Sequence, residues 1–372
     1  MIETLKNTID YLSTPTISFT LITVLFPFVF PPTDWFDKIN RKLRIDKLWT
    51  NTGGLIQFVL ITGFFVLGYQ DPNFKIILMK GDNFPIVLMV YSMAFFTWYA
   101  MKKSYINDAR LDEGKKPMEY HDPEDKVLVW PDLVYIEFIC LILFMVFLIV
   151  WSILVPAPLE EPANPAATPN PSKAPWYFLG LQEMLVYFDP WLAGVIFPTL
   201  IIVGMCAIPY IDINKKGDGY YSFKERRVGY FIFMYGWVVL WVYLIIIGTF
   251  FRGPNWNFFG PFEYWDPHKL EVLNNVNLSE YFWVIGLGQP LPSNILLRES
   301  VGFLVTGIYL FVLPVLLAKT VLKKMYEAYG PTRYTFLMIL GLSMLSLPIK
   351  MYLRWFFNLK YIIGIPEWFF NI

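Results

Sequence analysis

The chain is poor in charge, in histidine and in cysteine for its 372 residues. Charged residues make up 16% of it, whereas soluble domains carry about 25%. The formal net charge is zero, so nothing favours binding to nucleic acid. The shortage of charge is concentrated in long apolar runs, and such runs are typical of helices in lipid. We therefore expect an all-α, polytopic transmembrane helix bundle.

The scarce cysteines and histidines argue against metal centres. Cys140 and Cys206 lie inside apolar runs and outside any C-x-x-C or C-x-x-C-H pattern, which argues against zinc, iron–sulfur and covalent haem c sites. His121 and His268 both fall in predicted loops. A b-type haem in a helix bundle needs paired imidazoles that project inward from helices. We therefore expect no metal site and no haem ligated by this chain.

Eight apolar runs approach or exceed the roughly 20 residues that a spanning helix needs. They cover residues 15–31, 53–70, 84–101, 132–155, 190–211, 228–251, 298–318 and 335–357. The first run is short and is closed by prolines, so a re-entrant or interfacial helix is the alternative. The sequence thus predicts about eight spans, or seven if the first run does not cross.

Lysine and arginine are concentrated in every second connection between these runs. The basic segments are 38–47, 102–126, 215–227 and 319–333. Basic connections tend to face the cytoplasmic side of a membrane, so these four are predicted to lie inside. The first residues lack a basic region followed by a cleavage site, and no cleavable signal is expected.

Two long connections are predicted on the outer side, at 156–189 and 252–297. Long ordered loops are usually functional. The segment 156–171 carries six prolines and is therefore predicted to be stiff and extended. The following APWYFLGLQEMLVYF (174–188) has the spacing of a short aromatic helix at the membrane interface. Together they suit a flat, apolar ligand, or else form an ordinary surface cover. The aromatic segment 252–268 either caps this site or docks a partner.

Three short segments occur in an order that resembles a known family. They are PDLVYIEF (131–138), EPANPAATP (161–169) and APWYF (174–178). In this order they resemble the C-terminal half of cytochrome b, and equally subunit IV of plastoquinol-oxidising complexes. The resemblance covers roughly 127–320, so we divide the chain into an accessory segment 1–126, a quinol-binding domain 127–320 and an extra C-terminal helix in 321–372.

The resemblance implies two groups of quinone-site residues. In the family, a P-E-W-Y motif lines the outer quinol-oxidation site. The implied outer-side residues are Pro165, Ala174, Pro175, Trp176, Tyr177 and Phe178. The implied residues for inner-side quinone binding or proton entry are Asp132, Glu137 and His121. The alternatives are a helix N-terminal acid for Asp132, a carboxylate that reaches the interface for Glu137, and a plain loop residue for His121.

Pro175 departs from the family, because it stands where P-E-W-Y has glutamate. Quinol oxidation releases two protons, and proline cannot accept the second. Another acid must then serve. Glu183 is the candidate catalytic proton acceptor because it is the carboxylate within the predicted interfacial helix, unless it simply faces water. Asp189, Glu160 and Glu161 are the alternatives.

The resemblance implies a non-autonomous, haem-free subunit of a quinol–cytochrome c oxidoreductase. Its expected partners are a haem b-bearing cytochrome b N-terminal-type subunit, a Rieske iron–sulfur protein, a c-type cytochrome and the lipid membrane. The complex is expected to be dimeric and to lie in a bacterial inner membrane. A structural anchor without quinol chemistry is the alternative. A transporter is less favoured, because the sequence shows no inverted repeat.

Overall fold

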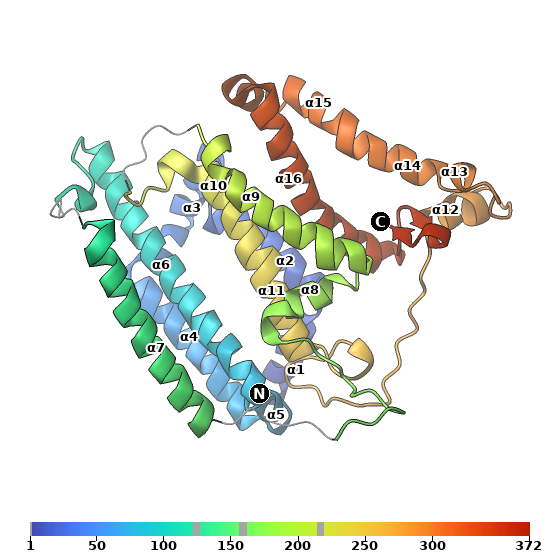
Figure 1. Cartoon of the computed structure of the whole chain (residues 1–372), viewed down its shortest axis with the longest axis horizontal. Coiled ribbons are helices and arrows are strands. Elements are labelled where there is room, and N and C mark those ends of the chain that lie inside the picture. The colour runs from blue at the N-terminus through green and yellow to red at the C-terminus, as the bar shows by residue number, and fades with distance from the viewer. Residues whose placement is uncertain (1, 122–126, 156–161, 214–218) are drawn as a thin grey trace. The chain divides into compact units, whose positions relative to one another are not determined.

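Helices make up most of the chain in the computed structural model, which describes residues 2–121, 127–155, 162–213 and 219–372 (Figure 1). The α-helices are α1 (Ile2–Ser13), α2 (Pro15–Val29), α3 (Asp34–Lys42), α4 (Asn51–Gln70), α5 (Pro72–Leu78), α6 (Phe84–Asp112), α7 (Val134–Leu154), α8 (Leu179–Met184), α9 (Phe197–Ile211), α10 (Arg227–Met234), α11 (Tyr243–Ile246), α12 (Leu278–Glu280), α13 (Ile295–Arg298), α14 (Ser300–Gly307), α15 (Leu313–Lys319) and α16 (Lys323–Phe357). The described residues also contain one antiparallel strand pair, β1 (Gly364–Ile365) and β2 (Phe370–Asn371). The predicted all-α fold is confirmed.

Short 3-10 and π-helical segments join several of these helices into longer stretches. Among the described residues, seven stretches are long and apolar enough to cross a membrane. They are Asn51–Gln70, Gly81–Asp112, Val129–Leu154, Leu192–Ile211, Lys224–Phe251, Ser300–Lys319 and Lys323–Phe357. The segments Glu3–Ser13 and Pro15–Val29, bent by 76°, form an eighth candidate, either a broken span or a re-entrant loop. Pro15 begins the second arm, where a ring without an N–H interrupts the helical hydrogen bonds.

Two helices are longer than their apolar runs predict. The helix α6 continues from the predicted end at residue 101 to Asp112. The last helix begins at Lys323 rather than 335, and its backbone departs from helical geometry at Gly330, where φ is 75°. Charged side chains end the contact of a helix with lipid, but lysine and arginine are good helix formers. Hydrophobicity therefore marks the membrane boundary and not the end of the helix.

The chain divides into two compact units, which are described separately. Unit 1 comprises Met1–Phe26, Asn170–Gly217 and Ile232–Ile372, and unit 2 comprises Pro27–Pro169 and Asp218–Phe231. These units are defined by contacts within the fold. The division of the sequence at residues 126 and 320 stays a prediction.

In unit 1, the side chain of Phe19 on α2 is fully buried among aromatic rings. Its ring centroid lies 5.7 Å from that of Tyr243, 5.9 Å from that of Tyr352 and 5.7 Å from that of Trp355. Tilted and edge-to-face contacts at such distances are favourable. Since Tyr243 belongs to α11, and Tyr352 and Trp355 to α16, the ring of Phe19 connects three helices.

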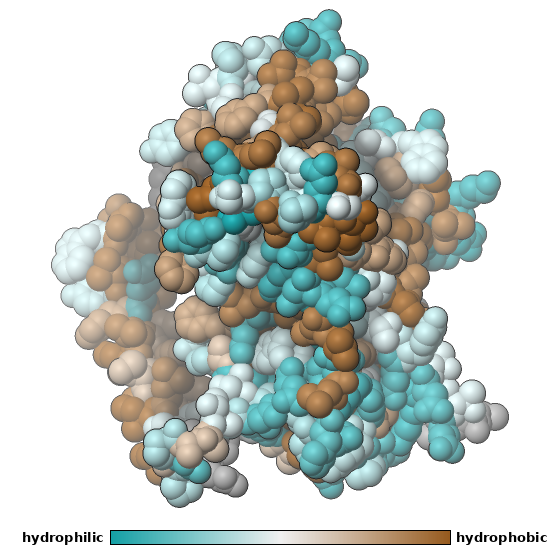
Figure 2. Space-filling view, turned by 90° about the vertical axis from the view of Figure 1, so that its right-hand side faces the viewer, coloured by the Kyte–Doolittle hydropathy of each residue, from teal (hydrophilic) through white to brown (hydrophobic). Residues whose placement is uncertain are grey.

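In unit 2, α4 and α6 lie side by side and are joined through α5 (Figure 1). Thr50 caps α4 by accepting the N–H of Gly53, and Asp71 caps α5 by accepting the N–H groups of Asn73 and Phe74. Of the span that contains α7, none of the tested window is buried. Figure 2, viewed from the side of Figure 1 on which α13 and α14 lie, shows hydrophobic areas interspersed with hydrophilic side chains on another face. Such exposed apolar surface fits contact with lipid or other subunits.

Candidate functional site

The aromatic edge, formed by Trp176, Tyr177 and Phe178, is a single 3-10 turn that leads into α8. The N–H of Phe178 donates to the carbonyl oxygen of Pro175 at 2.8 Å. Tyr177 and Phe178 are each 49% exposed, although both are large and apolar. The ring of Tyr177 lies edge-on to Trp176 at 5.7 Å between centroids. The turn thus presents aromatic surface outward at a fixed orientation.

Gln182 of α8 ties down the strap, which is the segment 170–175 before the aromatic edge. The side-chain oxygen of Gln182 accepts the N–H of Ala174 at 2.7 Å, and its nitrogen donates to the carbonyl oxygen of Ser172 at 2.9 Å. Lys173 donates to the carbonyl oxygen of Thr249 at 2.7 Å. The strap is therefore held by α8 on one side and by the end of the Lys224–Phe251 span on the other.

We expect Gln182→Ala to loosen the strap selectively. The substitution removes the acceptor of the Ala174 N–H, and a lost hydrogen bond of ~1 kcal/mol corresponds to about fivefold faster local exchange. Hydrogen–deuterium exchange of peptides within 170–175 measures this effect. Gln289→Ala, at an exposed glutamine, is the control. Equal exchange in both variants would show that the hydrogen bonds of Gln182 do not hold the strap.

Glu183 and Arg252 form a buried pair beneath the aromatic edge. The Nη2 of Arg252 donates to Oε1 of Glu183 at 2.6 Å, and its Nε donates to Oε2 at 2.9 Å. The indole N–H of Trp256 donates to the same Oε2 at 3.1 Å. Arg252 also donates to the carbonyl oxygen of Trp256 at 3.0 Å. Both oxygens of the carboxylate are thus engaged in a two-pronged, charge-assisted contact.

The buried pair corrects one sequence-based alternative. Glu183 is 0% exposed, so the interpretation that it faces water is wrong. The physical reason is Arg252, which follows directly after an apolar span and needs a counter-ion where water is excluded. Burial alone would lower the pKa of Arg252, but the Glu183 carboxylate raises it above its ordinary value. The guanidinium therefore stays charged.

The alternative acids lie in different settings. Asp189 accepts a hydrogen bond from the hydroxyl of Tyr361 at 3.0 Å, and burial together with this bond raises the pKa of Tyr361 to about 12. Asp189 is thus already engaged by a neutral phenol of the C-terminal segment. Glu160 and Glu161 lie outside the residues that the structure describes.

The outer loop after Phe251 is fastened to the strap. Asn170 and Asn255 exchange two hydrogen bonds, at 2.9 Å between their side chains and at 2.7 Å from the Asn255 N–H. Lys173 lies over the ring of Trp265, with 4.7 Å between the ammonium nitrogen and the ring centroid. Together with the hydrogen bonds of Arg252 and Trp256 to Glu183, these contacts fasten the loop to the strap and to α8. Capping of the quinol site by this loop stays a prediction. Docking of a partner on it stays a prediction.

The predicted site residues are distributed over the two units. Ala174, Pro175 and the aromatic edge lie with Glu183 in unit 1. Pro165, Asp132, Glu137 and His121 belong to unit 2. Pro165, Asp132 and Glu137 are exposed, and His121 ends the 3-10 turn Met118–His121. Their roles stay predictions.

Sequence reasoning missed Arg252, Trp256 and Gln182. Arg252 and Glu183 lie 69 positions apart, so no local pattern connects them. The sequence did contain a signal for the pair. Arg252 stands alone at one end of an apolar span whose other end carries the basic segment 215–227, and Glu183 is the single glutamate of the interfacial helix. Two isolated opposite charges at one membrane face predict a pair.

The spanning helices define an integral membrane protein. Residues 162–262 match the sequence model of the cytochrome b(C-terminal)/b6/petD family. This segment begins at the PANP loop and ends beyond Trp256, so it contains the strap, the aromatic edge and the buried pair. The resemblance to a cytochrome b C-terminal, subunit IV-like subunit is confirmed. No solved structure matches the chain significantly.

The match over residues 162–262 supports a membrane subunit of an electron-transport complex of the bc or b6f type. Such complexes are oxidoreductases that oxidise quinol, and cytochrome and Rieske proteins are their general partners.

Proposed function

We propose that the chain forms part of the outer quinol-oxidation site of a quinol–cytochrome c oxidoreductase. One observation carries the proposal. The segment that matches the family contains an exposed aromatic turn. The hydrogen bonds that join the strap and the outer loop to α8 fix the position of this turn. A site for a flat, apolar ring needs such fixed aromatic surface.

Each residue of the proposed site has a physical role. The half-exposed rings of Tyr177 and Phe178 contact the quinol ring, while Ala174, Pro175 and Trp176 form the adjoining wall. Pro165 of the PANP loop is proposed for the same wall. Quinol is the substrate, and its electrons pass to groups on other subunits. The haems are proposed to lie on those subunits, because this chain has two histidines in all and His268 lies in a loop with its side chain 92% exposed.

Glu183 stays our proposed acceptor for the second proton, under a condition that its contacts impose. Both carboxylate oxygens of Glu183 already accept N–H groups of Arg252 and Trp256. We therefore propose that the contact with Arg252 opens when Glu183 takes up a proton. In the closed state, Glu183 instead positions α8 and the aromatic edge. The two roles lead to different results for the variants described in the Discussion.

The remaining parts of the proposal concern the assembly. A haem b-bearing subunit, a Rieske protein and a c-type cytochrome are proposed as partners in a dimeric complex of a bacterial inner membrane. Asp132, Glu137 and His121 are proposed for an inner quinone site or for proton entry. Exposure of α7 along its whole length supports a helix that packs against another subunit.

Tyr177→Leu tests the site directly. Loss of an aromatic contact worth ~1.5 kcal/mol lowers quinol–cytochrome c reductase activity of the purified complex about tenfold. Sensitivity to outer-site inhibitors falls with it. Tyr264→Leu, at a tyrosine that is 68% exposed in the outer loop, is the matched control and keeps the activity. Unchanged turnover and inhibition in Tyr177→Leu would refute a quinol site at the aromatic edge.

A structural anchor without quinol chemistry is the second candidate. Two observations favour it, namely Pro175 in place of a carboxylate and the engagement of Glu183 by Arg252. If the chain is only an anchor, variants of the aromatic edge leave turnover unchanged, whereas deletion of the chain makes the complex dissociate. Activity and native mass of the complex, measured together, separate the two candidates.

A further inference from the structure

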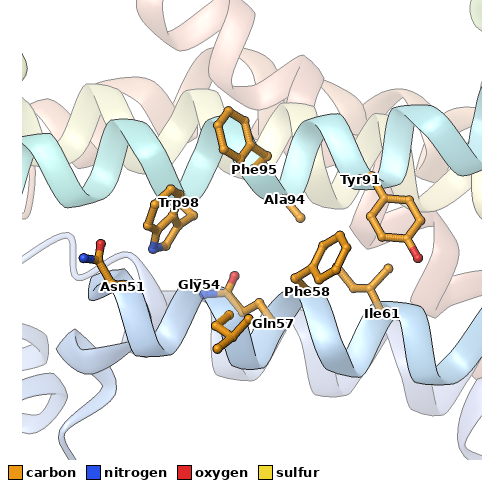
Figure 3. A pocket seen from close by; sticks show the side chains of 10 residues that line it. Asn51, Gly54, Gln57, Phe58, Ile61, Tyr91, Ala94, Phe95 and Trp98 are labelled. Atoms are coloured by element: carbon orange, nitrogen blue, oxygen red, sulfur yellow. The ribbon is translucent and has the colours of Figure 1, made fainter.

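A groove runs between α4 and α6 in the accessory part of the chain, outside the segment that matches the family (Figure 3). Its volume is about 340 Å³. Aromatic rings form much of its wall, namely Phe58 on α4 and Tyr91, Phe95 and Trp98 on α6. The volume lies within the range of ligand pockets in proteins, which is about 300–1,000 Å³.

The length of the groove matches one leaflet of a bilayer. Its lining on α4 extends from Asn51 to Ile61. At a helical rise of about 1.5 Å per residue, these ten steps span ~15 Å. The hydrocarbon core of a bilayer is ~30 Å thick, so the groove reaches from one face to the middle of the membrane. An acyl chain of one leaflet has this reach.

Three polar side chains of the groove are already engaged, which disfavours a ligand with polar ring substituents. The indole N–H of Trp98 donates to the carbonyl oxygen of Thr50 at 2.8 Å. The amide nitrogen of Gln57 donates to the carbonyl oxygen of Leu48 at 2.8 Å, and the hydroxyl of Tyr91 donates to Thr62 at 3.0 Å. A quinone ring therefore finds few donors here, whereas an acyl chain needs none.

The mouth of the groove is cationic. The ammonium nitrogen of Lys102 lies 5.0 Å from the ring centroid of Trp98, which lines the groove. Lys47 is exposed in the 3-10 turn Ile45–Trp49, directly before α4 and Asn51. This end adjoins the basic segments 38–47 and 102–126. Basic residues at a membrane surface attract anionic headgroups.

We propose that this groove binds one anionic phospholipid, with an acyl chain between α4 and α6 and the phosphate beside Lys102. Apolar walls, leaflet length and the charge at the mouth each fit this single occupant. Gly54 shapes the site, because a Cβ there would lie 2.5 Å from the indole of Trp98. The absent side chain lets the ring of Trp98 rest against α4 and close the inner end of the wall.

Photo-crosslinking in nanodiscs tests the proposal without any need for turnover. The full-length protein is placed in phosphatidylcholine discs with a trace of phosphatidylglycerol that carries a diazirine on its acyl chain. Labelled peptides are then located by mass spectrometry. We expect labels within 51–61 and 91–98. The phosphatidylglycerol probe is expected to label these segments more strongly than a phosphatidylcholine probe with the same diazirine.

Two variants and two controls make the test specific. Ala94→Leu fills the groove and reduces labelling to the level of the phosphatidylcholine probe. Lys102→Gln reduces it about fivefold, as expected for one basic residue at the surface. Val59→Leu, on the exposed face of α4, and Lys75→Gln, in α5 beyond the opposite end of α4, keep it.

Three outcomes would overturn the proposal. Equal labelling by the phosphatidylcholine probe would indicate ordinary surrounding lipid. Displacement of the probe by excess quinone would indicate a quinone site. Labelling that survives both Ala94→Leu and Lys102→Gln would indicate that the lipid lies elsewhere.

Discussion

Glu183→Gln is expected to destabilise the chain by about 3–5 kcal/mol, the usual cost of removing one partner of a buried ion pair. The substitution leaves Arg252 charged, since its guanidinium cannot be deprotonated in a protein, and buried, since it is only 8% exposed. Thermal unfolding of the purified protein in detergent measures the loss. Glu263→Gln is the matched control. It breaks a contact of 3.0 Å with Lys269 at the surface, where an ion pair contributes at most ~1 kcal/mol.

The double variant Glu183→Met with Arg252→Met separates stability from chemistry. Apolar residues of similar volume replace a buried pair at little or no cost, so the double variant is expected to regain stability that each single variant loses. If Glu183 accepts a proton, quinol turnover of the assembled complex stays low although the protein folds. If Glu183 only positions α8, turnover returns with stability. Wild-type stability in Glu183→Gln alone would contradict the buried pair itself.

Phe19→Ala is expected to destabilise unit 1 by about 3 kcal/mol, the lower end for replacement of a buried phenylalanine by alanine. Lipid solvates apolar side chains as well as a protein core does. The cost therefore comes from the lost ring contacts with Tyr243, Tyr352 and Trp355. The same unfolding measurement applies. Leu21→Ala, at a position 45% exposed on the same helix, serves as the control and changes little.

The result bears on the role of the first two helices. If Phe19→Ala also lowers the activity of the complex, the bent segment α1–α2 supports the unit that contains the aromatic edge. A loss as small as that of Leu21→Ala would instead mean that the segment adds nothing to the packing of unit 1.

Much of the fold could be predicted because lipid imposes a simple rule on sequence. The run 53–70 became Asn51–Gln70, and 190–211 became Leu192–Ile211. The extension of α6 to Asp112 could not be read from hydrophobicity, because there the polar side chains make their own contacts. Asp108, for example, accepts the N–H groups of Phe223 and Lys224, more than 100 positions away.

The candidate site was predicted less completely than the fold. Short motifs predicted the strap and the aromatic edge, since PANP and PWY are each a continuous stretch of sequence that can be recognised without the structure. Charge pairing is a property of three-dimensional proximity, so the partner of Glu183 had no local signature. The aromatic loop 252–268 was noticed for its composition, but composition cannot tell that Trp256 donates to a carboxylate on α8.

Arg252 has a consequence for how the chain enters the membrane. The span Lys224–Phe251 carries Lys224, Arg226 and Arg227 at its first end and Arg252 just beyond the other. Positive charge favours retention of a helix end on the inner side. Cations at both ends of this span therefore favour opposite orientations during insertion. Glu183 is synthesised earlier and can neutralise Arg252 once both reach the same face. Once paired with Glu183, Arg252 no longer affects the orientation of the helix. The larger cluster at the opposite end then determines which end stays on the inner side.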